Sequence, residues 1–126
     1  MYIGYNPNPN GNRVGDCAVR AICKAVGLIW EDAYIGLVTE GLKYYDMPSA
    51  NYVWGMFLRK HGFEKYMVAN RCPDCITVAQ FTELNPKGTY VLATDRHVVT
   101  AIDGDFYDSW DSSDEVVNYY WKKEDQ

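Results

Sequence analysis

The stretch HVVTAIDGDFYDSW, residues 97–110, places Asp103-Gly104 between two segments of alternating apolar residues. This dipeptide is a strong signal for a two-residue hairpin turn, because both turn positions need positive φ. We therefore predict strands over 97–102 and 105–110. In that register Ile102 lies opposite Asp105, and Val99 lies opposite Asp108.

The hairpin register predicts which side chains share a face of the sheet. Side chains alternate along a strand, so His97, Val99, Asp108 and Trp110 are expected on one face. Asp108 is then the diagonal neighbour of His97, within reach of its side chain. A carboxylate in this position can orient an imidazole and stabilise its cation. Asp111 is the competing carboxylate, but it falls on the opposite face.

The rest of the chain indicates an α+β fold in a single domain over 1–126. A loop is expected over 1–15, where prolines disfavour helix. Apolar periodicity and capping patterns predict helices, and apolar runs after turn residues predict further strands. Helices are expected at about 17–27, 30–42, 49–62 and 77–84, with Thr77 and Gln80 forming a capping box. Further strands are expected at 64–69, 89–94 and 116–121. Helices first and antiparallel strands last suggest N-terminal helices packed on a C-terminal antiparallel sheet.

Cys17 begins the first predicted helix, with Asp16 as a good N-cap. A helix start and a nearby histidine cation both lower the pKa of a thiol, so Cys17 is a candidate nucleophile with His97 as its base. Acyl transfer also needs donors for the oxyanion. The backbone amide of Cys17 is the first candidate. The side chain of Asn12 is the second, with Asn10 next.

Composition limits the function further. The chain has 126 residues and a net charge of −5, which argues against a nucleic-acid partner and mildly favours neutral or basic substrates. No apolar run is long enough to span a membrane, and the N-terminus lacks the pattern of a signal peptide. We therefore expect a cytoplasmic protein in which the four cysteines are thiols.

The remaining cysteines and histidine allow other interpretations. Cys72-Pro73-Asp74-Cys75 is a lone CxxC motif, which we interpret as a tight turn with two ordinary thiols. A zinc site would need two more ligands, for which Cys23 and His61 are available. A thioredoxin-like redox role would need a βαβ context, which is missing. His61 lies in the last turn of a predicted helix and is interpreted as structural. No metal or cofactor is expected.

These motifs together resemble the papain-like cysteine peptidases. The order Cys17, His97, Asp108 is similar to theirs, and Asp108-Ser109-Trp110 resembles the Asn-Ser-Trp of papain. Gly15-Asp16-Cys17-Ala18 with Ala21, and His97-Val98-Val99, resemble peptidase domains that cleave double-glycine leaders. Gly15-Asp16-Cys17 with Arg20-Ala21 faintly resembles ovarian-tumour-type deubiquitinases, and the whole chain is similar to small papain-like proteins of phages and bacteria. These families usually carry a Gln about six residues before the Cys, where this chain has Gly11.

The resemblance implies a papain-like fold and a Cys17–His97–Asp108 triad, with Trp110 shielding the contact between His97 and Asp108. The expected activity is hydrolysis of a peptide or isopeptide bond in a peptide or protein substrate. The alternative is a catalytically inactive binding or regulatory protein that keeps the fold. The oligomeric state and the cleavage specificity are left open.

Overall fold

The hairpin at Asp103-Gly104 forms in the predicted register. The computed structural model of the chain describes residues 1–69 and 71–124. Strand β4 (Val98–Ile102) is antiparallel to β5 (Asp105–Asp108), with Ile102 opposite Asp105 and Ala101 opposite Phe106. Both turn residues have positive φ, 49° at Asp103 and 88° at Gly104, as a two-residue turn of this kind requires.

The hairpin lies within a six-stranded mixed sheet of order β1-β5-β4-β3-β6-β2, counted over the described residues. The other strands are β1 (Tyr2–Gly4), β2 (Phe63–Met67), β3 (Thr89–Ala93) and β6 (Tyr119–Lys123). The last strand therefore begins three residues later than the predicted 116–121. The prediction of loop throughout 1–15 is wrong, because β1 pairs in parallel with β5. The other pairs are antiparallel, so the sheet is mixed and includes both ends of the described chain.

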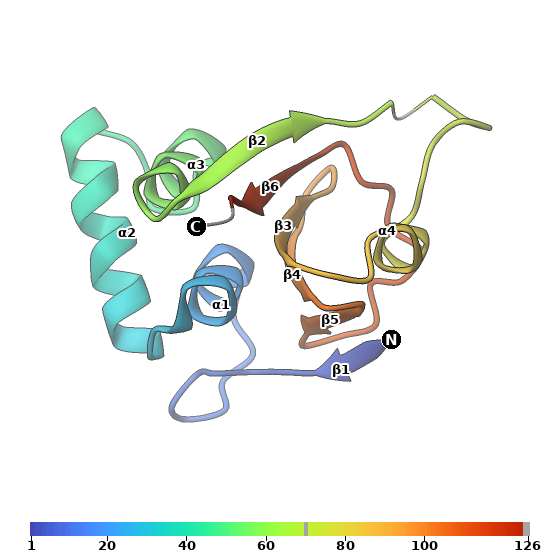
Figure 1. Cartoon of the computed structure of the whole chain (residues 1–126). Coiled ribbons are helices and arrows are strands. Elements are labelled where there is room, and N and C mark those ends of the chain that lie inside the picture. The colour runs from blue at the N-terminus through green and yellow to red at the C-terminus, as the bar shows by residue number, and fades with distance from the viewer. Residues whose placement is uncertain (70, 125–126) are drawn as a thin grey trace.

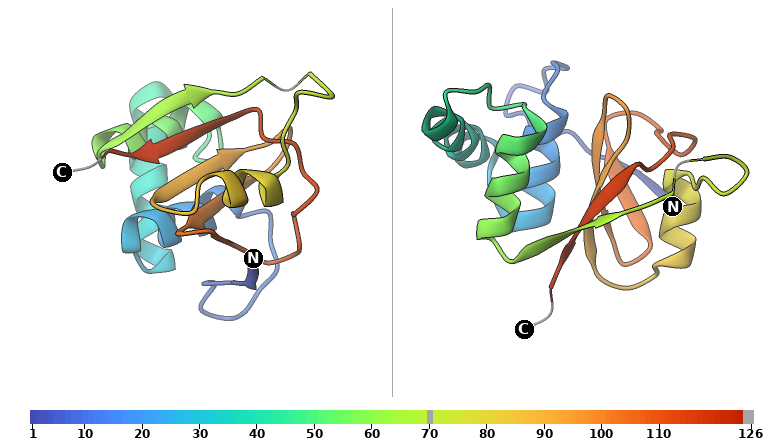
Figure 2. Two further views of the ribbon diagram at one scale, coloured as in Figure 1. Left: turned by 45° about the vertical axis from the view of Figure 1, so that its right-hand side comes forward. Right: turned by 90° about the horizontal axis from the view of Figure 1, so that it is seen from above.

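The helices cover both faces of this sheet. They are α1 (Cys17–Ile22), α2 (Trp30–Tyr44), α3 (Asn51–Lys60) and α4 (Val78–Leu84). The first three pack together on one face and α4 lies on the other (Figures 1 and 2). The capping box predicted at Thr77 and Gln80 is present at the start of α4. The chain is thus an α+β protein, as the sequence predicts.

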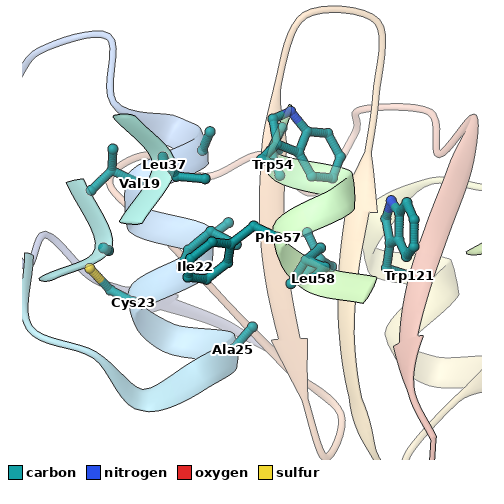
Figure 3. Close-up of a cluster of buried hydrophobic side chains, with 14 of the residues drawn as sticks. Val19, Ile22, Cys23, Ala25, Leu37, Trp54, Phe57, Leu58 and Trp121 are labelled. Carbon is teal, nitrogen blue, oxygen red and sulfur yellow. The ribbon is translucent and has the colours of Figure 1, made fainter. Parts of the chain in front are cut away.

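Two apolar clusters hold these layers. The larger lies between α1–α3 and the sheet (Figure 3) and includes Ile22, Leu37, Trp54, Leu58 and Trp121, all at most 5 % exposed. The smaller joins Phe81 of α4 to Leu92, Val99 and Phe106 on the opposite face. Full burial of side chains of this size stabilises a fold by about 1.5–3 kcal/mol each. A buried hydrogen bond also links the layers, since Thr100 Oγ on β4 donates to the Ala21 carbonyl at 2.8 Å.

The helix that begins at Cys17 differs from a regular, capped surface helix in three respects. After Ile22 it continues as a π-helical turn (Cys23–Gly27), and Gly27 ends it with φ of 82°, as its position after the apolar run suggests. Asp16 precedes the helix, but its side chain makes no capping hydrogen bond. Arg20 is buried, which is unusual for a charged helix residue. The missing cap at Asp16 and the burial of Arg20 both arise from the polar network described below.

Helix α2 buries only some of its apolar side chains. Ala33 and Leu37 are fully buried, whereas Tyr34, Val38 and Leu42 are exposed. No helix among the described residues has the length and apolar character needed to cross a membrane.

Candidate active site

Cys17 is the first residue of α1 and lies against the end of the β4–β5 hairpin. Cys17 and His97 line the same pocket, and the imidazole lies close enough to the thiol to lower its pKa. The fold thus brings together a sulfur from the helical layer and an imidazole from the sheet, across 80 positions of sequence. This is the juxtaposition that the sequence predicts.

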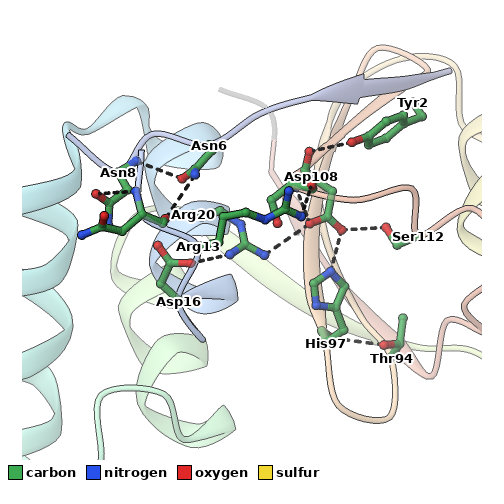
Figure 4. A network of polar contacts seen from close by, with 12 residues as sticks. Tyr2, Asn6, Asn8, Arg13, Asp16, Arg20, Thr94, His97, Asp108 and Ser112 are labelled. Atoms are coloured by element: carbon green, nitrogen blue, oxygen red, sulfur yellow. Dashed lines mark hydrogen bonds and ion pairs between the residues drawn. The ribbon is translucent and has the colours of Figure 1, made fainter. Parts of the chain in front are cut away.

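His97 and Asp108 are in direct contact. His97 Nε2 lies 2.5 Å from Asp108 Oδ2 (Figure 4), which leaves Nδ1 as the ring nitrogen available to Cys17. The Thr94 amide donates to the His97 carbonyl at 2.9 Å and closes the turn before β4. The Trp110 ring lies over the imidazole with 4.7 Å between ring centroids. Trp110 therefore packs on His97, beside the contact with Asp108 that the resemblance implies it shields.

The two side chains meet because they lie at strand ends. His97 directly precedes β4, and Asp108 is the last residue of β5. Within the strands, Val99 and Phe106 face the cluster under α4, so strict alternation would turn His97 and Asp108 away from α1. The β4–β5 ladder ends at Thr100 and Tyr107, before either residue is reached. Beyond the β4–β5 ladder, where Asp108 pairs with Gly4 of β1, both side chains reach the α1 side, and Arg20 contacts Asp108 there.

The surroundings of Cys17 favour its thiolate. Burial alone would raise the pKa of the thiol, but the hydrogen bond and charge of His97, the Val98 amide and the Arg20 charge lower the pKa of Cys17 overall. The other free thiol behaves in the opposite way. Burial, with the charge of Asp16 as a smaller cause, raises the pKa of Cys23 to about 11. Only one of the two free thiols is thus poised for reaction.

His97 is correspondingly held as a cation. Its burial disfavours the charge, but hydrogen bonds to Asp108 and Cys17 outweigh this and raise the pKa of His97 to about 9. Burial likewise disfavours a charged Asp108. Hydrogen bonds from His97, Ser112 and the Ser109 amide nevertheless lower the pKa of Asp108. Cys17, His97 and Asp108 are therefore stabilised as a thiolate, an imidazolium and a carboxylate.

Three further residues support this arrangement and escaped the sequence analysis. Arg20 pairs with Asp16 and reaches Asp108 Oδ1 at 3.3 Å, so it bridges two buried carboxylates (Figure 4). Trp30 Nε1 donates to Asp16 Oδ2 at 2.9 Å. Ser112 Oγ donates to Asp108 Oδ2 at 2.7 Å. The i,i+4 spacing of Asp16 and Arg20 is a signal that could have revealed their pairing. No local signal indicates Ser112.

The asparagine-rich loop forms one wall of the site. Asn12 lines a pocket of about 410 Å³ together with Cys17, His97 and Trp110. Among the described residues, no hydrogen bond engages the Asn12 side chain, so its amide can donate into the pocket. Asn6, which was not predicted, also lines the pocket, but its amide nitrogen already donates to the carbonyls of Gly11 and Asn12. Asn10, the second choice from sequence, does not line it.

The pocket also carries two basic side chains. Arg13 and Arg96 line it, and Arg13 donates to the Ser109 carbonyl at 3.1 Å. The acidic balance of the whole chain therefore does not extend to this opening, which is a poor match for the expectation of basic substrates.

Several alternative assignments do not fit the structure. Asp111 contacts Ser113 on an exposed loop. His61 bonds the Phe57 carbonyl through Nδ1 at 2.8 Å and stacks on the Phe57 ring, a structural role. Cys72 and Cys75 form a disulfide, so the expectation that all cysteines are free thiols is wrong. Sulfurs bonded to each other cannot serve as thiolate ligands, and no group of three or more potential metal ligands gathers within 1–69 and 71–124.

Comparison of the chain with protein families, with curated proteins and with solved structures finds no match.

Proposed function

We propose that this protein is a small cysteine hydrolase that cleaves a peptide or isopeptide bond through Cys17, His97 and Asp108. One observation carries the proposal. Cys17 contacts a histidine that is itself anchored by a buried carboxylate, and the pKa of the thiol is lowered while that of the imidazole is raised to about 9. A thiolate–imidazolium pair is the reactive form of such a nucleophile and base. The papain-like fold is part of the same proposal.

In the first half of the reaction the Cys17 thiolate attacks the carbonyl carbon of the scissile bond. The Cys17 backbone amide and the Asn12 side chain donate to the oxyanion that forms. His97 then gives its proton to the leaving nitrogen as the carbon–nitrogen bond breaks. An amine departs, and the acyl group is held on Cys17 as a thioester.

In the second half water replaces the amine. Neutral His97 takes a proton from the water while the water oxygen attacks the thioester carbon. The carbon–sulfur bond breaks, the carboxylic acid leaves, and the thiolate–imidazolium pair is restored. Asp108 keeps Nε2 occupied throughout, so Nδ1 stays directed at the reacting groups. Trp110 covers this contact from the solvent side.

Selective alkylation tests the nucleophile directly. Iodoacetamide is added to the native protein at pH 7, and the labelled sites are identified by mass spectrometry over time. Cys17 is expected to react much faster than Cys23, whose thiol is buried and has a pKa of about 11. His97→Ala should slow the labelling of Cys17 sharply, because the cation that stabilises the thiolate is lost.

Turnover is tested with a peptide library in which acyl groups trapped on Cys17 are detected as a mass increase. Cys17→Ala should abolish trapping, and Cys23→Ser serves as the matched cysteine control that retains it. If Cys17 reacts no faster than Cys23, or reacts equally well without His97, the hydrolase proposal is wrong and the inactive binding protein is favoured instead.

A further inference from the structure

A second pocket lies between α3 and the β2 edge of the sheet. It has a volume of about 460 Å³, which is in the range of pockets that hold small molecules. Residues of α3 form one wall, and residues of β2 and β6 form the other. The pocket shares no lining residue with the one that contains Cys17 and His97. It is therefore a separate candidate site.

The charged side chains that line this pocket are both cations. They are Arg59 of α3 and Lys65 of β2, and no acidic residue lines the pocket. In the described part of the chain, no carboxylate lies within ion-pair distance of either cation. The chain as a whole has a net charge of −5, so this unpaired positive region is local. It favours an anionic ligand.

Aromatic rings hold the two cations in place. The Nζ of Lys65 lies 4.3 Å from the centre of the Tyr119 ring, and the guanidinium carbon of Arg59 lies 5.4 Å from that of Trp121. Both distances are within the range of a cation–π contact. Lys65 also lies opposite Trp121 in the β2–β6 ladder. The two charges are thus positioned around one strand, β6, without being neutralised by a carboxylate.

Trp121 provides an independent indication of a ligand. Its side chain lines the pocket and is 5 % exposed, and its Nε1 is the one buried side-chain nitrogen or oxygen without a hydrogen-bond partner in residues 1–69 and 71–124. A buried donor without an acceptor is unfavourable and therefore rare. Figure 3 shows this nitrogen on the edge of the indole that faces α3. Gly55 of α3 lies at the same edge, since a Cβ there would come within 2.8 Å of Trp121 Cζ2.

Asn51 adds a further donor to the lining. Its Oδ1 accepts from Trp54 Nε1 at 3.1 Å, so its amide nitrogen is the part of the side chain left for a ligand. Apart from two tyrosine hydroxyls, which can donate or accept, the polar side-chain groups offered by the pocket are donors. A carboxylate is their natural complement, because it only accepts hydrogen bonds.

We infer that this pocket binds a small aromatic carboxylate. The carboxylate lies between Arg59 and Lys65, on the side of the Trp121 N–H. The aromatic body lies against Tyr52 and Met56, which also line the pocket. A bare inorganic anion would leave most of the 460 Å³ and the aromatic surface unfilled. The inference does not depend on the proposed hydrolase function.

The test follows the indole N–H signals of ¹⁵N-labelled protein by NMR while phenylacetate is added. The chain has four tryptophans, and Trp121→Phe identifies the signal of Trp121. Phenylacetate, added to about 10 mM, should shift this signal in a saturable way. Phenylacetamide has the ring without the charge, and acetate has the charge without the ring. Each should bind roughly tenfold or more weakly than phenylacetate.

Variants locate the binding in the pocket. Arg59→Met and Lys65→Met each remove one exposed cation, and each should weaken phenylacetate binding roughly tenfold without changing the binding of phenylacetamide. Lys122→Met is the matched control, because Lys122 is exposed on β6 but does not line the pocket. Cys17→Ala should bind phenylacetate as the wild type does, which separates this site from the catalytic proposal.

Several outcomes would overturn the inference. These are the absence of a Trp121 shift, equal binding of phenylacetate and phenylacetamide or acetate, and binding that survives both Arg59→Met and Lys65→Met. Acetyl-Ala-Ala-Phe with a free carboxylate should bind no tighter than phenylacetate. Much tighter binding would assign the pocket to the end of a peptide chain instead of a small molecule. Failure of Cys17 to react with iodoacetamide would bear on the hydrolase proposal alone.

Discussion

The guanidinium of Arg20 donates to the carboxylate of Asp108 at 3.3 Å, although 88 positions separate the two residues. Arg20 lies one turn after Cys17, and Asp108 is the residue that anchors His97. The same guanidinium pairs with Asp16, directly before Cys17. One buried cation thus ties the helix that carries the thiol to the hairpin that carries its base.

Replacing Arg20 should cost more stability than replacing an exposed arginine. Arg20→Met would leave the buried carboxylates of Asp16 and Asp108 without their shared cation, and breaking such a pair costs about 3–5 kcal/mol. Urea unfolding measures this loss. Arg59→Met is the matched control, since Arg59 is exposed on α3. Equal midpoints for the two variants would contradict a bridging role for Arg20.

Asp108→Asn should weaken the thiolate. The neutral amide no longer stabilises the His97 cation, so the pKa of His97 falls toward its ordinary value and that of Cys17 rises. We expect iodoacetamide labelling of Cys17 at pH 7 to slow by roughly tenfold or more, which corresponds to about one pKa unit. Asp111→Asn is the control and should leave the rate unchanged, because Asp111 lies on an exposed loop and contacts Ser113. The reverse result would identify Asp111 as the anchor.

Ser112→Ala should remove one donor from Asp108 without disturbing the hairpin. Loss of the 2.7 Å hydrogen bond to Oδ2 is expected to reduce the free energy of unfolding by about 1–2 kcal/mol. It should also make the pKa of Asp108 less depressed, so the acid midpoint of unfolding moves to higher pH. Ser113→Ala is the control, because the Ser113 hydroxyl donates to Asp111 on an exposed loop and not to Asp108. A midpoint that does not move would show that Ser112 is dispensable.

Turnover should follow a bell-shaped pH profile. The acid limb reports formation of the thiolate and lies below the ordinary thiol value, because the pKa of Cys17 is lowered. The alkaline limb lies near the pKa of His97, about 9, where the proton needed by the leaving nitrogen is lost. Both limbs are checked by initial rates from pH 4 to 11, measured on a peptide that the library screen identifies as a substrate. An alkaline limb near 6.5 would contradict the anchored imidazolium.

The stability of the protein should show the same titration with a defined sign. The pKa of His97 is raised on folding, so its contribution is fully present below the unfolded value of about 6.5 and is lost as the pH rises through about 9. The gap in unfolding free energy between wild type and His97→Gln should therefore shrink from pH 6 to pH 10, by roughly 2–3 kcal/mol. A gap that widens over this range would have the wrong sign.

The parts of the structure with strong local signals could be predicted from the sequence. Asp103-Gly104 specified the turn and therefore the register, because both residues tolerate positive φ. The Thr77 capping box specified the start of α4. The contact of His97 with Asp108 was also predicted from the hairpin, but for an incomplete reason, because both side chains depart from strand alternation and lie on the α1 side, opposite Val99.

The parts that depend on distant partners could not be predicted. Strand β1 is only three residues long, and its pairing with β5 leaves no periodic pattern in the sequence. In the sequence Arg20 looks like an ordinary polar helix residue. Its ion pair with Asp108 of the sheet becomes visible only in the folded structure. Asp16 has the chemistry of a helix cap, but its oxygens are taken by Arg20 and Trp30. In each case tertiary contacts override the local preference.

The hydrogen bond from Thr100 to the Ala21 carbonyl has a consequence for how the protein opens. It joins Thr100, three residues after His97, to Ala21, one turn after Cys17. It therefore connects the strand that follows the base to the helix that carries the nucleophile. Loss of this hydrogen bond would loosen the contact between helix and sheet that holds Cys17 beside His97. The rate at which Cys17 is alkylated therefore reports local opening between α1 and the sheet. It should fall in mild denaturant while the overall fold is still present.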